Sequence, residues 1–132
     1  MKTLVLDASV GVKWFRDEPG SAEARALLRA HGSGEVRIAV PSLFVHEFAG
    51  VATRFLDAEE VRELWARFLD WRIHVREVSD SLMRDAFALR DRYGCTLYDA
   101  ISPALAVQLG ATLYSADRRA HGGIPDVVIF GK

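Results

Sequence analysis

The chain has 132 residues, a net charge of −1 and one cysteine, and 50% of its residues are hydrophobic. This length suffices for one core, so we expect a single domain over residues 1–132. The balanced charge excludes a globally basic nucleic-acid-binding protein, so a polyanion would need local arginines or a bridging cation. One cysteine forms no internal disulfide, and no stretch has transmembrane length, so we expect a cytoplasmic protein with no membrane association.

The first part of the chain alternates strand-like and helix-like patterns. Residues 3–6 form a short apolar run, typical of a buried strand, which ends at Asp7. Residues 9–16 predict a short helix, and residues 22–31 predict a second one that ends in a glycine-rich stretch. Residues 36–40 predict another strand, which stops at a proline.

A helical hairpin is expected over residues 42–71. Apolar residues recur at helical spacing in its first arm, residues 42–56. Asp57 and Glu60 have the spacing of a capping box, which would open a second arm that runs to about Trp71.

The remaining chain continues the alternation. Residues 80–93 predict a helix that stops at a glycine, and Thr96 with Asp99 resembles a capping box that opens another, ending at Gly110. Three more strands are expected, at residues 73–78, 111–115 and 126–130. Such alternation predicts a three-layer α/β/α sandwich with a mostly parallel central sheet, in which ligands bind at the carboxyl ends of the strands.

Acidic residues lie where these strands end. Asp7 follows the first strand, and Asp117 comes shortly after the strand at residues 111–115. If the two strands are parallel neighbours, both side chains project into one crevice. Asp99 lies in the first turn of the helix that leads to the later strand.

Glu47 lies among apolar residues in the first arm of the hairpin. At about 100° per residue, Leu43 and Val51 flank it on one helical face. We therefore expect Glu47 to be buried and paired with a cation or a proton, since an unpaired carboxylate there would be unfavourable by roughly several kcal/mol.

Each acid also has a purely structural alternative. Asp7 and Asp117 could cap the helices that follow them, and Asp99 could be only the third residue of its capping box. Glu47 could pair with Arg54 on the same side of its helix. A shared role is favoured, because four carboxylates in one crevice repel one another unless a multivalent cation is present.

Oxygen ligands without clustered histidine or cysteine favour Mg²⁺ or Mn²⁺ over Zn²⁺. A carboxylate-bound divalent cation suits a phosphate ester, because it bridges the two anions and orients a water molecule. Ser9 and Ser115, each two residues from an acid, could hydrogen-bond a ligand carboxylate or a metal-bound water, or be ordinary turn hydroxyls. The four histidines are scattered, form no Ser–His–Asp pattern, and include His46, which is expected to be solvated.

Four segments in order resemble the PIN-domain family, and within it the VapC-like ribonuclease toxins of toxin–antitoxin pairs. The matching segments are LVLDASVGVKWF (4–15), PSLFVHEFAGVATRF (41–55), LYDAISPALAVQLGATLYSADRR (97–119) and the terminal strand. The resemblance covers essentially the whole chain and implies a PIN-like fold and an Mg²⁺- or Mn²⁺-dependent endoribonuclease. The catalytic and metal-binding residues that it implies are Asp7, Glu47, Asp99 and Asp117.

The resemblance also implies partners. These are an RNA substrate, a small VapB-like antitoxin that wraps the hairpin and blocks the site, and a second copy of the chain in a homodimer. DNA would be bound only through the antitoxin. Arg16, Arg118 and Arg119 follow the site strands and could contact RNA phosphates, or simply be solvated.

Two positions depart from the family pattern. Gly50, three residues after Glu47, stands where the family often has asparagine, and a helical glycine costs about 1 kcal/mol. Pro103 stands where the family usually continues its helix with leucine or alanine. It lacks the N–H that would bond the carbonyl of Asp99, so we expect a kink or a wide turn there. Neither change removes an acid, and activity is expected.

Two other function classes compete. A non-catalytic PIN domain would act as a binding or assembly module, although the presence of all four acids argues against it. A phosphotransfer enzyme would use Asp7 as nucleophile, but a dehalogenase-type site would want a second acid where Ser9 stands. A receiver domain would want an acid pair near the first strand and a lysine after a late one, and neither is evident.

Overall fold

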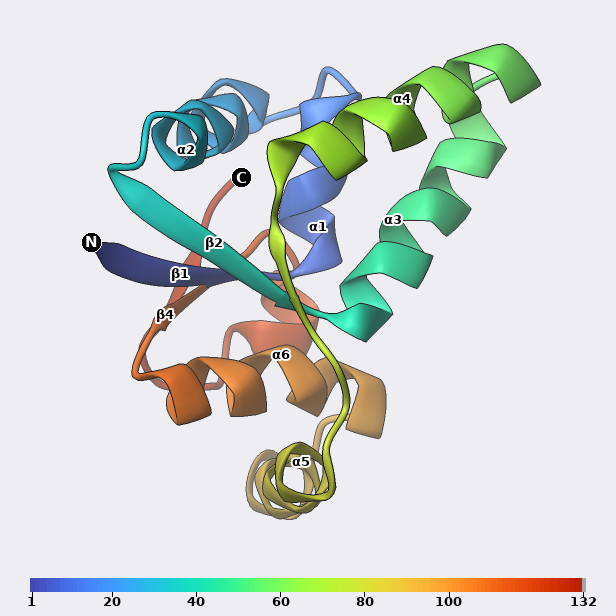
Figure 1. The fold of residues 1–132 in the computed structure, drawn as a ribbon. Helices are drawn as coiled ribbons and strands as arrows, with labels where there is room; N and C mark the ends of the chain where they lie inside the picture. Colours follow the sequence, from blue (N-terminus) through green and yellow to red (C-terminus); the bar gives the residue numbers. More distant parts are fainter. Residues whose placement is uncertain (132) are drawn as a thin grey trace.

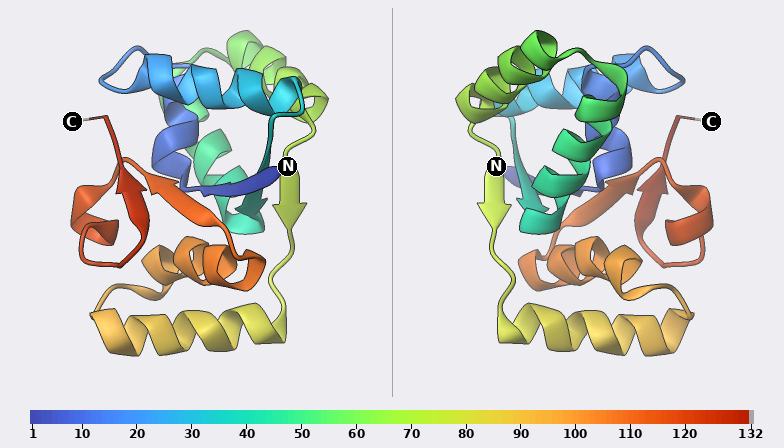
Figure 2. Two further views of the ribbon diagram at one scale, coloured as in Figure 1. Left: turned by 90° about the vertical axis from the view of Figure 1, so that its left-hand side faces the viewer. Right: turned by 90° about the vertical axis from the view of Figure 1, so that its right-hand side faces the viewer.

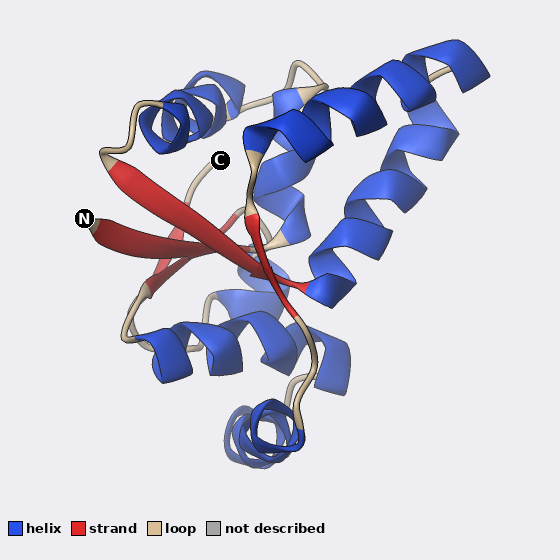
Figure 3. Cartoon of the chain, in the orientation of Figure 1, coloured by secondary structure: helices blue, strands red, loops and turns tan. Residues whose placement is uncertain are grey.

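A computed structural model describes residues 1–131, which contain one sheet of five strands in the order β3–β2–β1–β4–β5 (Figure 3). All four strand pairs are parallel, which confirms the expected parallel sheet. The strands are β1 (Lys2–Leu6), β2 (Val36–Pro41), β3 (His74–Arg76), β4 (Thr112–Ser115) and β5 (Val127–Ile129).

Helices cover both faces of the sheet (Figure 1). The helices are α1 (Ala8–Gly11), the 3₁₀ turn η1 (Val12–Trp14), α2 (Ser21–Gly32), α3 (Ser42–Phe55), α4 (Ala58–Trp71), α5 (Asp80–Tyr93), α6 (Leu97–Leu109) and α7 (Arg118–His121). Figure 2 shows α5 and α6 stacked below the sheet, and α1 to α4 on its other side. The expected three-layer sandwich with a helical hairpin, α3 and α4, is therefore confirmed.

The two helical layers enclose separate hydrophobic cores. Neighbouring residues of β1 serve different cores: Leu6 packs with Phe44 and Phe48 of α3, whereas Val5 packs with Ile101 of α6. A strand buried on both faces reads as a continuous apolar run, as the first strand does in the sequence.

Local signals define the helix ends well. Asp57 and Glu60 form the complete capping box at the start of α4, with backbone-to-carboxylate distances of 2.8 and 3.0 Å. The Ser79 hydroxyl accepts from the N–H of Leu82 at the start of α5, and Gly94 ends that helix in the left-handed conformation.

Three features differ from the sequence expectations. Residues 9–16 form a short α-helix and a 3₁₀ turn instead of one helix, and the expected strand at 73–78 shrinks to three exposed residues at the sheet edge. The expected wide turn at Pro103 is absent, because α6 continues through this proline as one helix. Within residues 1–131, no helix is both long enough and apolar enough to cross a membrane.

Candidate active site at the carboxyl end of the sheet

Asp7 occupies the junction between β1 and α1. Its backbone N–H donates to the carbonyl of Tyr114 on β4 (3.0 Å), which ties the junction to the neighbouring strand. Its carboxylate oxygen Oδ2 accepts from the N–H of Ser9 (3.0 Å), so Asp7 does cap α1. The side chain is half-buried, and no hydrogen bond within residues 1–131 engages its second oxygen, which stays free for a ligand.

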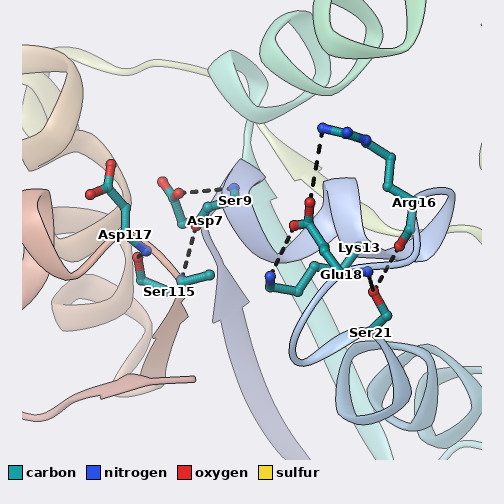
Figure 4. Close-up of polar contacts among 9 residues, drawn as sticks. Asp7, Ser9, Lys13, Arg16, Glu18, Ser21, Ser115 and Asp117 are labelled. Carbon is teal, nitrogen blue, oxygen red and sulfur yellow. Dashed lines mark hydrogen bonds and ion pairs between the residues drawn. The ribbon is translucent and has the colours of Figure 1, made fainter. Parts of the chain in front are cut away.

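Asp117 lies beside Asp7, across the paired strands β1 and β4. Its Oδ1 accepts from the N–H of Ala120 (3.0 Å), so this acid also caps a short helix, α7. The hydroxyl of Ser9 accepts from the N–H of Ala116 (2.9 Å) and fastens the loop that carries Asp117 to α1. Figure 4 shows the carboxylates of Asp7 and Asp117 pointing to the same side of this junction.

Asp99 lies in the first turn of α6, half-buried. Its N–H donates to the hydroxyl of Thr96 (3.1 Å), which is one half of a capping box. The reciprocal bond from the Asp99 carboxylate to the N–H of Thr96 is not formed, unlike the complete box on α4. Its carboxylate is therefore available for another role.

Glu47 projects from α3, and the expectation that it is buried is wrong. The buried residues of α3 are Phe44, Phe48 and Ala52, whereas Glu47 is exposed to solvent. Periodicity placed it beside Leu43 and Val51, which are only half-buried, whereas Phe44, Phe48 and Ala52 set the buried face of the helix. The alternative pairing with Arg54 is also absent, and no ion pair within residues 1–131 involves any of the four acids.

The electrostatics of Glu47 show which groups surround it. Its pKa is raised above the ordinary value, mainly because neighbouring atoms remove water from its carboxylate. The negative charges of Asp7 and Asp99 raise the pKa further. Glu47 is thus within electrostatic range of both Asp7 and Asp99, although the three acids come from separate elements.

The donor set of this site fits a hard divalent cation. It consists of carboxylate oxygens that repel one another, the situation that Mg²⁺ or Mn²⁺ relieves. In the part of the chain that the structure describes, no three His, Cys, Asp or Glu side chains are already close enough to hold one ion. The fit therefore rests on the chemistry and charge of the acids.

The two serines bond within the protein. Ser9 holds the loop before Asp117, as described above, and Ser115 is completely buried. The Ser115 hydroxyl lies 2.7 Å from Nδ1 of His121 and accepts from the N–H of Asp117 (3.1 Å). The structural alternative for both hydroxyls is thus the one observed.

The arginines divide into two kinds. The guanidinium of Arg16 lies 3.6 Å from the ring centroid of Phe55 and 3.9 Å from Glu18, so its contacts are within the protein. Arg118 and Arg119 are exposed on α7, directly after Asp117, and remain open to solvent and ligands.

His121 is the residue near the site that the sequence reasoning missed. It ends α7, is only 1% exposed, and bonds both Ser115 and the backbone carbonyl of Asp99. A histidine four residues after Asp117 was the only direct sequence signal, and it was too weak to separate this residue from the other three histidines.

Comparison with known proteins places these observations in a family. The sequence pattern of the PIN-domain family matches residues 4–122 of this chain. The chain is 30% identical over 130 residues to "Ribonuclease VapC3" of Pyrobaculum aerophilum, covering 95% of this chain and 97% of that protein.

Solved structures share the fold. A toxin–antitoxin complex from Klebsiella pneumoniae contains a chain that superposes with a TM-score of 0.74 at 21% identity, covering 95% of both chains. A chain of VapBC2 from Rickettsia felis, bound to a DNA fragment from its promoter, gives 0.72 at 16% identity, covering 96% of both.

Proposed function

The chain belongs to the PIN-domain family, and from this premise we propose that it is the endoribonuclease toxin of a toxin–antitoxin pair. The proposal is supported by the placement of Asp7 and Asp117 side by side where the paired strands β1 and β4 end (Figure 4), and by the position of Glu47 within range of the charges of Asp7 and Asp99. The relative that is named a ribonuclease is 30% identical, and the match covers nearly its whole length. This relative supports the same reaction class.

The proposed cofactor is Mg²⁺ or Mn²⁺, held by Asp7, Glu47, Asp99 and Asp117. When bound, such a cation supplies an activated water molecule and offsets the charge that develops on the phosphodiester. The protein contributes the arrangement of the acids. The bond from Ser9 N–H fixes the Asp7 carboxylate (3.0 Å), and the bond from Ala120 N–H fixes that of Asp117 (3.0 Å).

The RNA would approach over the open end of the sheet. The exposed Arg118 and Arg119 next to Asp117 are suited to contact backbone phosphates, which arginine binds well. Arg16 is less suited, because it already stacks on Phe55. The near-neutral net charge of the whole chain fits a substrate bound through local cations and a metal ion.

The proposed protein partner is a small antitoxin that covers the α3–α4 hairpin. Three large apolar side chains remain exposed on this hairpin, Phe55, Trp65 and Leu69. Trp65 also lines a surface pocket between the two arms, together with Leu56 and Val61. DNA would be reached only through the antitoxin, and a homodimer and a cytoplasmic location belong to the same proposal.

The proposal is tested by RNA cleavage with added Mg²⁺ or Mn²⁺. Asp7→Asn and Asp99→Asn each remove one charge with little change in shape, and cleavage should fall by about 100-fold or more, in line with other electrostatic groups of active sites. Glu63→Gln, on the exposed face of α4, serves as the matched control and should cleave like the wild type.

Equal cleavage by the wild type and both asparagine variants would refute the assignment of these acids. A wild type that shows no divalent-metal binding by calorimetry and no cleavage would support the alternative, a non-catalytic PIN-domain module for binding or assembly.

A further inference from the structure

The helix that contains Asp99 has a proline at the position whose N–H would normally bond the Asp99 carbonyl. In an α-helix, the carbonyl of residue 99 accepts from the N–H of residue 103. Residue 103 is proline, which has no N–H, so α6 leaves the Asp99 carbonyl without its helical donor. A backbone carbonyl beside a buried core needs a replacement donor.

His121 provides that donor from a different element. Its Nε2 lies 2.9 Å from the carbonyl oxygen of Asp99, 22 residues away in the chain. Because a carbonyl oxygen only accepts, Nε2 must carry the hydrogen. The ring is 1% exposed, so water does not compete for this bond.

The remaining bonds of the ring then have a fixed direction. In a neutral imidazole with its hydrogen on Nε2, Nδ1 is an acceptor, so the hydroxyl of Ser115 donates to it across 2.7 Å. The same hydroxyl oxygen accepts the N–H of Asp117 (3.1 Å). A directed chain of three hydrogen bonds thus runs from Asp117 through Ser115 and His121 to Asp99.

We infer that His121 is a positioning residue: it replaces the helical donor that Pro103 removes, and it couples the backbone of Asp99 on α6 to that of Asp117 before α7. The inference rests on the proposed function only in treating these two acids as parts of one active site. The hydrogen bonds of His121 go to the Ser115 hydroxyl and the Asp99 carbonyl and not to either carboxylate, so it acts through the backbone that carries them.

His31 is an internal reference for the position of the ring hydrogen in His121. It accepts the N–H of Ile38 at Nδ1 (3.0 Å), and its Nε2 lies 2.9 Å from the carbonyl of Trp71. A backbone N–H can only donate, so His31 must carry its hydrogen on Nε2. His31 therefore has the hydrogen-bonding pattern inferred for His121, but at the other end of the sheet.

The first test is spectroscopic and independent of activity. Long-range ¹H–¹⁵N NMR spectra of the wild type at mildly alkaline pH, assigned with His31→Gln and His121→Gln, report which ring nitrogen carries the hydrogen. We expect His121 to match His31, with the hydrogen on Nε2. A His121 ring with its hydrogen on Nδ1, or on both nitrogens, would overturn the directed chain.

The second test is a double-mutant cycle between His121 and Pro103. His121→Leu removes the donor and should lower Mn²⁺ affinity, measured by calorimetry, about 10-fold, as loss of groups that orient metal ligands commonly does. His121→Gln keeps an N–H near the position of Nε2 and should restore part of that affinity. Pro103→Ala returns a helical N–H to Asp99, so His121→Leu should cost clearly less in this background.

The controls separate this inference from the proposed function. His31→Gln should lower the melting temperature without changing Mn²⁺ affinity, because its bonds lie away from the acids. If His121→Leu lowers Mn²⁺ affinity equally in the wild type and in the Pro103→Ala background, the positioning role is overturned. If the wild type binds no Mn²⁺, the proposed function fails, and the tautomer and the same cycle in melting temperature still decide the inference.

Discussion

Glu47 carries an electrostatic conflict within the site. Its carboxylate is partly stripped of water and faces the negative charges of Asp7 and Asp99, and both effects raise its pKa from the ordinary 4.5. Ionisation of Glu47 in the metal-free protein therefore opposes folding. The stability linked to the protonated group is complete below pH 4.5 and is lost as the pH rises through the raised folded-state pKa.

This predicts that Glu47→Gln is stabilising in the absence of metal. In the presence of a chelator, melting temperatures of the two proteins should be similar in acid and diverge as the pH rises, with Glu47→Gln the more stable. Added Mg²⁺ should raise the melting temperature of the wild type more than that of the variant. Thermal scans across acid to neutral pH provide the measurement.

Glu63→Gln is the control, because Glu63 is exposed on α4 and away from the acids. Its melting curve should follow the wild type at every pH. If the melting temperatures of the wild type and Glu47→Gln change in parallel with pH, the acids do not repel one another in the folded chain.

Sequence reasoning at this scale found the acids but not their surroundings. Asp7 and Asp117 follow strands, so a parallel sheet is enough to bring them together. The exposure of Glu47 depends on how α3 is turned against the core, where Phe44, Phe48 and Ala52 form its buried face, and helical periodicity alone does not fix this. His121 was missed because its partner, the Asp99 carbonyl, is a backbone group whose need for a donor appears only once Pro103 is seen inside a continuous helix.

At the scale of the element, α3 contains a helix-destabilising glycine, Gly50, close to the site. Gly50 lies in the exposed part of this helix, has a negative φ, and a Cβ added there would meet no atom within 4 Å. Its lack of a side chain therefore serves no local packing purpose in the described chain, and only the entropic cost of a helical glycine remains.

We predict that Gly50→Ala stabilises the protein by about 1 kcal/mol, the difference between the two residues within a helix. Urea unfolding measures this change. The expected gain contrasts with Gly110→Ala at the end of α6, where the surroundings are equally open but φ is +60°. That variant should be destabilised by about 1 kcal/mol, because alanine disfavours the left-handed region.

The two glycines have equally open surroundings, and they differ in backbone conformation and in their position along the helix. A loss of stability in Gly50→Ala would mean that the position has a contact that the described chain does not provide.

The ends of the longer helices were predicted well for a physical reason. Helix ends are set by local chemistry, such as the Ser79 and Asp57 caps and the left-handed Gly94, and these signals are visible in the sequence. The ends of strands are set by the neighbouring strand. β3 lies at the sheet edge with all three residues exposed, and it stops short of the strand expected at 73–78.

At the scale of the whole molecule, an ion pair near the start of the chain lies against the backbone of its C-terminal segment. Lys13 in η1 is 4% exposed, and its Nζ lies 2.9 Å from Glu18, which is 30% exposed. Figure 4 shows this pair on the far side of β1 from Asp7 and Asp117. The backbone of Gly131 packs against the end of the Lys13 side chain so closely that a Cβ there would lie 2.9 Å from Nζ.

The unequal burial of the two charges predicts an unequal response to mutation. Glu18→Ala leaves a buried ammonium group without its carboxylate and should cost about 3 kcal/mol. Lys13→Met leaves a carboxylate that water still reaches, so it should cost less. The double variant should be more stable than Glu18→Ala alone, because it removes the unpaired charge and keeps an apolar side chain of similar length against Gly131.

Urea unfolding of the wild type, the two single variants and the double variant measures the four stabilities of this double-mutant cycle. RNA cleavage should stay unchanged wherever the protein is folded, since the pair is separate from the acids. If Glu18→Ala and Lys13→Met cost the same and their effects add, the pair is an ordinary surface contact, and the closure of the fold around Lys13 rests on packing alone.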